Sequence, residues 1–264
     1  MSLPKEVRRL LTKNQGRDSI IGTAIHHSEF RSRYDLLPRN VTVWLPPSYA
    51  KKRGERYPVL YMHDGQNLFD PKTSYAGVDW RVDETITSLV KGNKLDECIV
   101  VGVHNTPDRL AEYSISEKGI WYQKFLVEEL KPFIDSNYRT RVEAEHNAVM
   151  GSSMGGLCSL TLVWQYPEVF GKAGCLSSSF YYGDNAVFKM IESDYSGKKK
   201  IKVYLDSGED GKYDAQKMFL LLSQKGMRIG DDLDYYYDRG AQHNESYWAD
   251  RLARPLLFFF ERKD

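Results

Sequence analysis

Five residues from Gly151 to Gly155 read Gly-Ser-Ser-Met-Gly, which fits the pattern Gly-x-Ser-x-Gly with Ser153 at its centre. The pattern lies between a segment predicted as a strand and a segment predicted as a helix. At such a junction the central serine takes a strained backbone conformation and its hydroxyl projects above the sheet. The alternative is a glycine-rich turn that only packs a helix against a strand. We predict that Ser153 is a nucleophile, because suitable partners follow downstream.

A serine hydroxyl is a weak nucleophile at neutral pH, so it needs a base, usually a histidine that a carboxylate orients. With this pattern the three residues follow the chain in the order serine, acid, histidine. His243 is the only one of the six histidines that lies after Ser153. It follows a predicted strand and precedes the last predicted helix. This position favours a base over the alternative, an ordinary surface histidine.

The acid is expected after the predicted strand at 201–208, where four carboxylates are close together. Asp210 is the first choice, because it lies just past the Gly208 turn and can reach back toward His243. Asp206 is the second choice, since it can lie at the strand end itself. The other two carboxylates have simpler interpretations, a helix N-cap for Asp214 and a solvated side chain for Glu209.

An ester carbonyl under attack develops negative charge on its oxygen, which two backbone N–H groups can stabilise. One donor is expected from the residue after the nucleophile, Met154, and the other from the loop after the predicted strand at 57–65. Gln66 is best placed for this second role. We interpret the side chains of His63 and Asp64, just before it, as a hydrogen-bonded turn.

Strands and helices alternate along most of the chain. Apolar and β-branched runs predict strands at 39–49, 57–65, 97–103, 146–151, 169–177, 201–208 and 232–238. Helical spacing predicts helices at 79–92, 119–138, 155–167, 215–226 and 246–261. This order predicts an α/β fold with a mainly parallel central sheet, helices on both faces and an antiparallel N-terminal edge. In such sheets ligands bind beyond the carboxyl ends of the strands.

The composition narrows the classes of protein. The chain has 264 residues and a formal net charge of +1, so it lacks the electrostatic footprint of a nucleic-acid-binding protein. Three widely spaced cysteines predict buried free thiols, and the histidines show no metal-ligand spacing. We expect one domain over 1–264, in which residues 1–20 form a poorly ordered or peripheral segment.

The sequence contains no recognisable signal peptide or membrane span, so no membrane partner is expected. A cytoplasmic location is the default expectation, and removal of a leader peptide stays open. The sequence does not indicate an oligomeric state.

Several side chains in the predicted loops could contact a substrate. Trp80, Tyr181 and Trp248 could stack on a sugar or phenolic ring, and Arg109 could shape the acyl or alcohol pocket. The alternatives are that the aromatic side chains belong to the core and rim, and that Arg109 takes part in an ion pair within its loop. We carry all four as candidate substrate-binding residues.

The segments YPVLYMHDGQNLFD, MGSSMGGLCSL and GAQHNESYW resemble the putative esterase family of α/β-hydrolases. That family includes feruloyl and other carbohydrate esterases, enterochelin-type esterases and mycolyltransferases. The resemblance spans the chain roughly from Arg39 to its C-terminus. It implies an α/β-hydrolase fold, Ser153 as nucleophile, His243 as base, and the N–H groups of Gln66 and Met154 as oxyanion hole.

The acid of that family commonly follows a Gly-x-x-Asp/Glu pattern. Here the pattern starting at Gly208 ends on Gly211, so the choice between Asp210 and Asp206 stays open. Together these observations predict a serine esterase that needs no cofactor and acts on a small soluble ester, for example a carbohydrate-linked acyl ester. A siderophore esterase, an acyltransferase and a non-catalytic binding protein on the same fold are the alternatives.

Overall fold

The fold is that of a computed structural model, in which residues 20–262 are described. The expectation for residues 1–20 lies outside the described residues, apart from Ile20. The strands are β1 (Thr23–Phe30), β2 (Arg39–Leu45), β3 (Val59–His63), β4 (Ile99–Val103), β5 (Asn147–Ser152), β6 (Lys172–Leu176), β7 (Lys202–Ser207) and β8 (Leu233–Tyr237).

The helices lie between these strands and after the last one. The α-helices are α2 (Val82–Lys91), α3 (Arg109–Glu112), α4 (Glu117–Phe125), α5 (Lys131–Asn137), α6 (Met154–Gln165), α7 (Tyr182–Glu192), α8 (Lys212–Gln224), α9 (Glu245–Arg251) and α10 (Ala253–Phe260). Two short 3₁₀ helices, η1 (Gly65–Asn67) and η3 (Ala144–His146), and a π-helical segment, η2 (Leu126–Leu130), complete the set.

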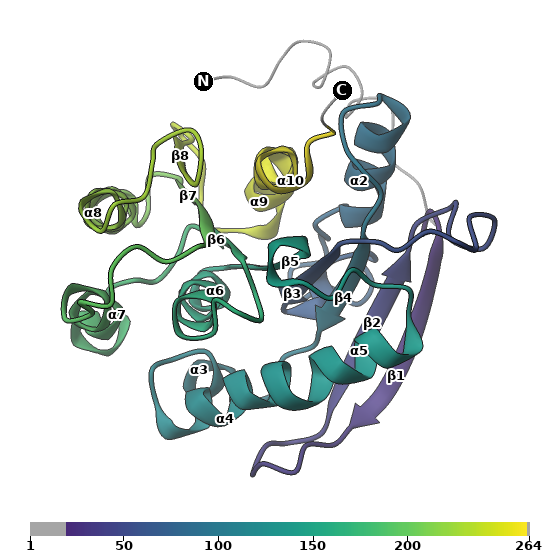
Figure 1. The fold of residues 1–264 in the computed structure, drawn as a ribbon, viewed down its shortest axis with the longest axis horizontal. Helices are drawn as coiled ribbons and strands as arrows, with labels where there is room; N and C mark the ends of the chain where they lie inside the picture. Colours follow the sequence, from purple (N-terminus) through teal and green to yellow (C-terminus); the bar gives the residue numbers. More distant parts are fainter. Residues whose placement is uncertain (1–19, 263–264) are drawn as a thin grey trace.

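The eight strands form one sheet in the order β1-β2-β4-β3-β5-β6-β7-β8. β1 and β2 are antiparallel to each other, and β2 is antiparallel to β4, whereas the pairs from β4 through β8 are parallel. This arrangement confirms the predicted mainly parallel sheet with an antiparallel N-terminal edge. The carboxyl ends of β3 through β8 consequently lie along one edge of the sheet (Figure 1).

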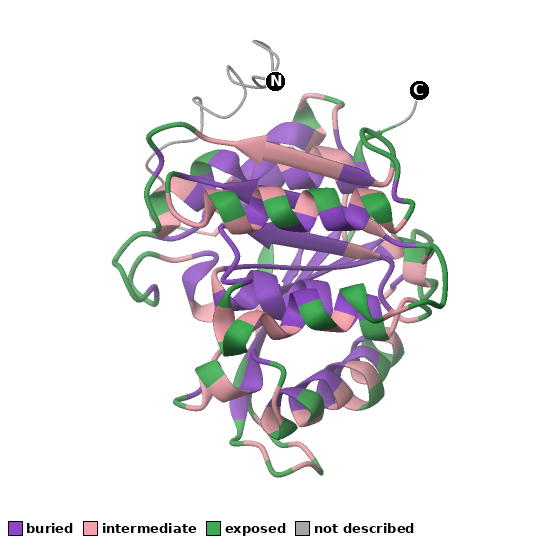
Figure 2. Cartoon of the chain, turned by 90° about the vertical axis from the view of Figure 1, so that its left-hand side faces the viewer, coloured by how far each residue is buried: buried purple, intermediate pink, exposed green. Residues whose placement is uncertain are grey.

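Both faces of the sheet are covered, as predicted. Val59 and Tyr61 of β3 pack into the core beneath α4 to α8, while Leu60 and Met62 pack into the core beneath α2, α9 and α10. All four side chains are buried, which explains why a central strand reads as a continuous apolar run. Figure 2 shows the central strands in purple and the outer turns of the helices in green and pink.

The structure also differs from the sequence-based prediction in several elements. β1 and α7 were not predicted, and the segment at 119–138 is interrupted by the π-helical η2. The predicted helix at 246–261 is two helices, α9 and α10, that meet at Leu252. β1 is an edge strand with several exposed side chains, including polar ones, so its apolar pattern is weak.

The three cysteines are free and buried, as predicted. Within the described residues, no helix is long and apolar enough to cross a membrane.

Candidate active site

The candidate catalytic residues lie at one edge of the sheet. Ser153 follows β5, Asp210 follows β7, and His243 follows β8. Because β5 to β8 are parallel neighbours, the loops after them emerge at the same edge. The sheet topology therefore brings three residues to a common edge, although they are far apart in the sequence. Asp210 follows Ser153 by 57 positions, and His243 follows Asp210 by 33.

The backbone of Ser153 is strained. Its φ of 55° and ψ of −122° form a combination that residues other than glycine rarely adopt. The Ser153 N–H donates a hydrogen bond to the carbonyl of Leu176 at the end of β6, at 2.9 Å. A side chain at position 155 would place its Cβ 3.2 Å from the Cβ of His63, so Gly155 allows β3 and α6 to approach closely. These contacts hold the serine at a tight strand-to-helix turn.

Helix α6 behind Ser153 is almost entirely buried, from Met154 to Trp164. Its N-terminus presents unpaired N–H groups and the positive end of the helix dipole at the turn that carries Ser153. The Ser153 hydroxyl hydrogen bonds with the hydroxyl of Ser179, and the two oxygens lie 3.1 Å apart. Ser179 itself follows β6 and is 5% exposed.

Gln66 lies in the short helix η1, directly after β3. Its side-chain oxygen accepts a hydrogen bond from the Asn105 N–H at 3.3 Å. Asp64, just before it, has a left-handed backbone with φ of 57°. Since His63 lies against Gly155, the turn that carries Gln66 is next to the first turn of α6, where Met154 lies. The two predicted oxyanion donors are thus on neighbouring segments.

His243 has a carboxylate partner. Its Nδ1 is hydrogen bonded to Oδ2 of Asp210, and the two side chains are 40% and 35% exposed. The imidazole also packs edge-on against the indole of Trp248, with ring centroids 4.9 Å apart. A carboxylate on Nδ1 favours the tautomer that has its proton there, which leaves Nε2 free to accept a proton.

The loops that carry Asp210 and His243 are held together by backbone contacts. The Glu209 N–H donates to the carbonyl of Ala241 at 3.0 Å, and the Gly240 N–H donates to Oε1 of Glu209 at 2.8 Å. A Cβ at position 208 would lie 2.3 Å from the Ala241 carbonyl oxygen, so Gly208 is required for this close approach. The exposed Glu209 therefore also fastens the loop, beyond the solvated role expected for it.

The remaining two carboxylates of this region, one in β7 and one in α8, have different surroundings. Asp206 is 1% exposed and accepts hydrogen bonds from the guanidinium of Arg251 at 3.0 Å and from the Ser177 N–H at 3.1 Å. Burial raises the pKa of Asp206, although Arg251 opposes the effect. The prediction that Asp214 caps a helix is wrong, because α8 begins earlier, with Gly211 as its N-cap.

The four candidate substrate-binding residues have unequal access to solvent. Trp80 and Trp248 are 3% and 6% exposed and pack against each other, with ring centroids 5.8 Å apart. They belong to the core beneath His243, in line with the alternative interpretation. Tyr181 is 59% exposed after β6. Arg109 makes an ion pair with Asp64, with nitrogen–oxygen distances of 2.7 and 2.8 Å.

Sequence reasoning missed two features of this edge. Ser179 was missed, although it ends a run of three serines that begins with the last residue of the predicted strand at 169–177. The partner of Arg109 was also missed, because Asp64 and Arg109 come from loops after different strands. Glu112 pairs instead with Arg39, at 2.6 Å.

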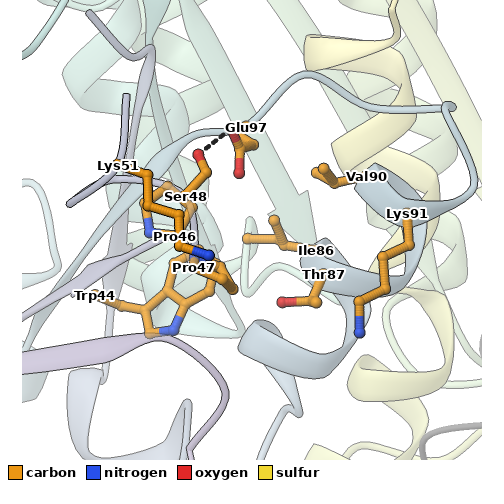
Figure 3. A pocket seen from close by; sticks show the side chains of 10 residues that line it. All are labelled: Trp44, Pro46, Pro47, Ser48, Lys51, Ile86, Thr87, Val90, Lys91 and Glu97. Atoms are coloured by element: carbon orange, nitrogen blue, oxygen red, sulfur yellow. Dashed lines mark hydrogen bonds between the residues drawn. The ribbon is translucent and has the colours of Figure 1, made fainter. Parts of the chain in front are cut away.

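A separate cavity lies at the opposite edge of the sheet. It has a volume of about 230 Å³ and is lined mainly by apolar groups of β2, α2 and the segments next to them (Figure 3). Ser48 follows β2 and donates a hydrogen bond to Glu97, which precedes β4, at 2.5 Å. Because β2 runs antiparallel to β4, this cavity is at the amino ends of the parallel strands, away from Ser153.

Among residues 20–262, no group of three or more His, Cys, Asp or Glu side chains is arranged to hold a metal ion.

Because His63 is buried, we expect the free energy of unfolding to depend on pH. Its side chain is 3% exposed, and burial lowers its pKa from 6.5 to about 4. The unfolded chain therefore binds a proton on this residue between pH 6.5 and about 4, whereas the folded chain does not. We expect the free energy of unfolding to fall by about 3 kcal/mol through this group as the pH is lowered across that range.

Urea denaturation of the wild type and of His63→Gln at pH 7 and pH 4.5 measures this effect. The variant is expected to lose less stability between the two pH values than the wild type. Equal losses would show that His63 does not contribute.

Proteins of known sequence resemble the chain over most or part of its length. It is 26% identical over 244 residues to the uncharacterized protein YbbA of Bacillus subtilis, which covers 84% of this chain and 92% of YbbA. It is 31% identical over 147 residues to an endo-1,4-beta-xylanase/feruloyl esterase of Xylanibacter ruminicola, which covers 54% of this chain but 20% of that protein.

Solved structures with the same fold include a ferulic acid esterase, with a TM-score of 0.74 and 20% identity over 92% of this chain and 99% of that one. The enterobactin esterase of Shigella flexneri matches with a TM-score of 0.74 and 17% identity, over 91% of this chain and 59% of its own. At these identities the likeness concerns the fold. Residues 37–259 match the family described as "Putative esterase", so the chain belongs to the Putative esterase family of α/β fold.

Proposed function

We propose that the protein is a serine carboxylic-ester hydrolase in which Ser153, His243 and Asp210 form a catalytic triad. The observation that carries this proposal is the backbone of Ser153, whose φ of 55° at the β5–α6 junction is costly for a serine. Such strain is retained where a hydroxyl must project above a sheet. The hydrogen bond between His243 and Asp210 at the same sheet edge supports the assignment.

In the first half-reaction, the Ser153 oxygen attacks the ester carbonyl carbon while Nε2 of His243 takes the hydroxyl proton. The Ser153 side chain exchanges its bond with Ser179 for one with His243 as substrate binds. The carbonyl oxygen becomes an oxyanion that accepts hydrogen bonds from the N–H groups of Gln66 and Met154. Asp210 stabilises the imidazolium through Nδ1.

Collapse of this intermediate breaks the bond to the alcohol oxygen, which takes the proton from Nε2 of His243. The acyl group then remains on Ser153 as an ester. A water molecule gives a proton to Nε2 of His243 and attacks the acyl carbon. Collapse of this second tetrahedral intermediate breaks the bond to the Ser153 oxygen, which takes the proton back from His243, and releases the carboxylic acid. This route requires no cofactor.

The substrate we propose is a soluble ester, in particular an acyl ester linked to a carbohydrate. The half-exposed side chains of His243 and Asp210 favour an open site that a large alcohol portion can reach. Tyr181 offers an exposed ring for stacking near the end of β6. The chain resembles proteins named as a feruloyl esterase and a ferulic acid esterase, which supports this class of substrate.

A siderophore ester is the second candidate, supported by the fold shared with enterobactin esterase. An anionic chelate would need cations at the site, and the guanidinium of Arg109 is already paired with Asp64. We therefore rank this candidate below the carbohydrate ester. Acyl transfer uses the same residues with an alcohol in place of water.

Activity on p-nitrophenyl, acetyl-sugar and feruloyl esters tests the proposal, with Ser153→Ala as the blank. We expect hydrolysis of at least one p-nitrophenyl ester and a preference for a sugar-linked substrate. Product analysis with a competing alcohol present separates hydrolysis from acyl transfer. If the protein hydrolyses none of these esters, the proposed function is contradicted.

A further inference from the structure

The turn that carries Gln66 is fastened by a network of side chains around one buried carboxylate. Asp64 is 7% exposed and accepts two hydrogen bonds from Arg109, from Nε at 2.7 Å and from a terminal nitrogen at 2.8 Å. The Asn105 side chain donates a third, to Oδ1 at 2.7 Å. Asn105 also contacts Gln66 directly, through its backbone N–H. The loop after β4 therefore holds the η1 turn at two neighbouring positions.

The same carboxylate lies beside the first turn of α6. A Cβ placed on Gly155 would lie 3.6 Å from Oδ2 of Asp64, and Gly155 is two residues after Ser153. The Asp64 N–H points to the Tyr113 hydroxyl at 3.2 Å, and the Arg109 guanidinium lies over the Tyr113 ring, 5.1 Å from its centroid. Asp64 thus connects the η1 turn to the loop after β4 and lies beside the nucleophile helix.

At this position the negative charge of Asp64 needs a partner, and Arg109 supplies the positive charge. A buried negative charge next to an oxyanion hole would oppose the negative charge that forms on the ester oxygen. A two-pronged guanidinium–carboxylate pair cancels the charge and also fixes the orientation of the carboxylate. A lysine would supply the charge but not both directed hydrogen bonds.

We propose that Arg109 is a positioning residue, which acts through Asp64 to hold the oxyanion-binding turn in place and to screen the carboxylate from the oxyanion. The inference rests on the proposed function. It assigns Arg109 a part in the transition state without contact with the substrate, in place of the substrate contact predicted from the sequence. The expected signature is a loss in kcat with little change in KM.

The test uses the full-length protein and p-nitrophenyl butyrate. Arg109→Met is expected to lower kcat about 10- to 100-fold, with KM changed less than about threefold, because the donor is displaced and the carboxylate is unscreened. The rate of inactivation by a fluorophosphonate should fall in parallel, since its phosphoryl oxygen occupies the same hole. Arg109→Lys should give a milder loss of the same kind, and it replaces the methionine variant if that protein does not fold.

A double variant distinguishes this role from a merely structural one. Asp64→Asn combined with Arg109→Met removes the unscreened charge, so its kcat should recover at least about fivefold relative to Arg109→Met. Glu112→Gln is the matched control, because Glu112 lies on the same short helix and forms a buried pair with Arg39. The control should lower the melting temperature and leave kcat within about threefold of wild type.

The outcomes separate the inference from the proposed function. If the wild type neither hydrolyses the ester nor reacts with the fluorophosphonate at Ser153, the proposed function fails. If the wild type does both while a folded Arg109 variant keeps its kcat, or the double variant shows no recovery, this inference alone is overturned.

Discussion

Ser153→Ala is expected to lower kcat for ester hydrolysis about 10⁶-fold, which is the scale of loss when a triad nucleophile is removed. The remaining rate is expected from binding and from the proposed oxyanion hole, which the substitution leaves in place. The melting temperature should fall little or rise, because the hydroxyl makes one hydrogen bond, to Ser179, and the strained turn persists. Steady-state kinetics and thermal unfolding of the same preparation measure both effects.

Ser152→Ala is the matched control for this prediction. Ser152 is the adjacent residue, ends β5 and is 4% exposed, so its side chain is buried away from solvent. The control variant should keep most of its activity, and a fluorophosphonate should label it on Ser153. Near-normal turnover by Ser153→Ala, or labelling of Ser152 in the wild type, would refute the assignment of the nucleophile.

The local patterns in the sequence were sufficient to predict the central part of the fold. β3 is a continuous apolar run because Leu60 and Tyr61 face different cores and both are buried. The Gly-x-Ser-x-Gly pattern located the strand-to-helix junction. There a Cβ on residue 155 would lie 3.2 Å from the Cβ of His63, so Gly155 leaves room for a close approach. The apolar run and the Gly-x-Ser-x-Gly pattern each involve residues that are close in the sequence, so both can be recognised from periodicity and spacing.

Features that depend on distant partners could not be predicted in the same way. Trp80 and Trp248 come from segments far apart in the sequence and bury each other, whereas their types alone were equally compatible with an exposed stacking surface. Arg109 was considered for substrate contact or for an ion pair within its own loop, whereas its partner, Asp64, belongs to another loop. Ion-pair partners follow from sheet order, which alternation of strands and helices leaves undetermined.

The choice between Asp206 and Asp210 shows the same limit. Asp206 lies in β7 and Asp210 lies shortly after this strand. From the sequence alone, Asp210 is preferred because it follows the Gly208 turn and can reach back toward His243. The structure adds an observation of a different kind. Asp206 is already engaged by Arg251 of α9, so its charge is balanced within the fold. Asp210 faces His243, and within residues 20–262 its other oxygen has no hydrogen-bond partner.

Asp210→Asn is expected to lower kcat about 10⁴-fold, because an amide can present its N–H to Nδ1 and hold His243 in the wrong tautomer. The Asp210 side chain is 35% exposed, so the melting temperature should change little. Asp206→Asn should instead lower the melting temperature and leave residual activity. It removes the buried one of the two carboxylates that pair with Arg251. The side chains of Asp206 and Arg251 are at most 2% exposed, and breaking such a buried pair costs about 3–5 kcal/mol.

Measurement of kcat and melting temperature for both variants decides between the two acids. A large loss of kcat with unchanged stability belongs to the residue that orients His243, whereas a large loss of stability with residual activity belongs to the residue that joins β7 to α9. Should Asp206→Asn be folded and inactive while Asp210→Asn remains active, the two roles are exchanged. Activity in both variants would mean that neither carboxylate orients His243, since a base that has lost its orienting acid cannot keep near-normal turnover.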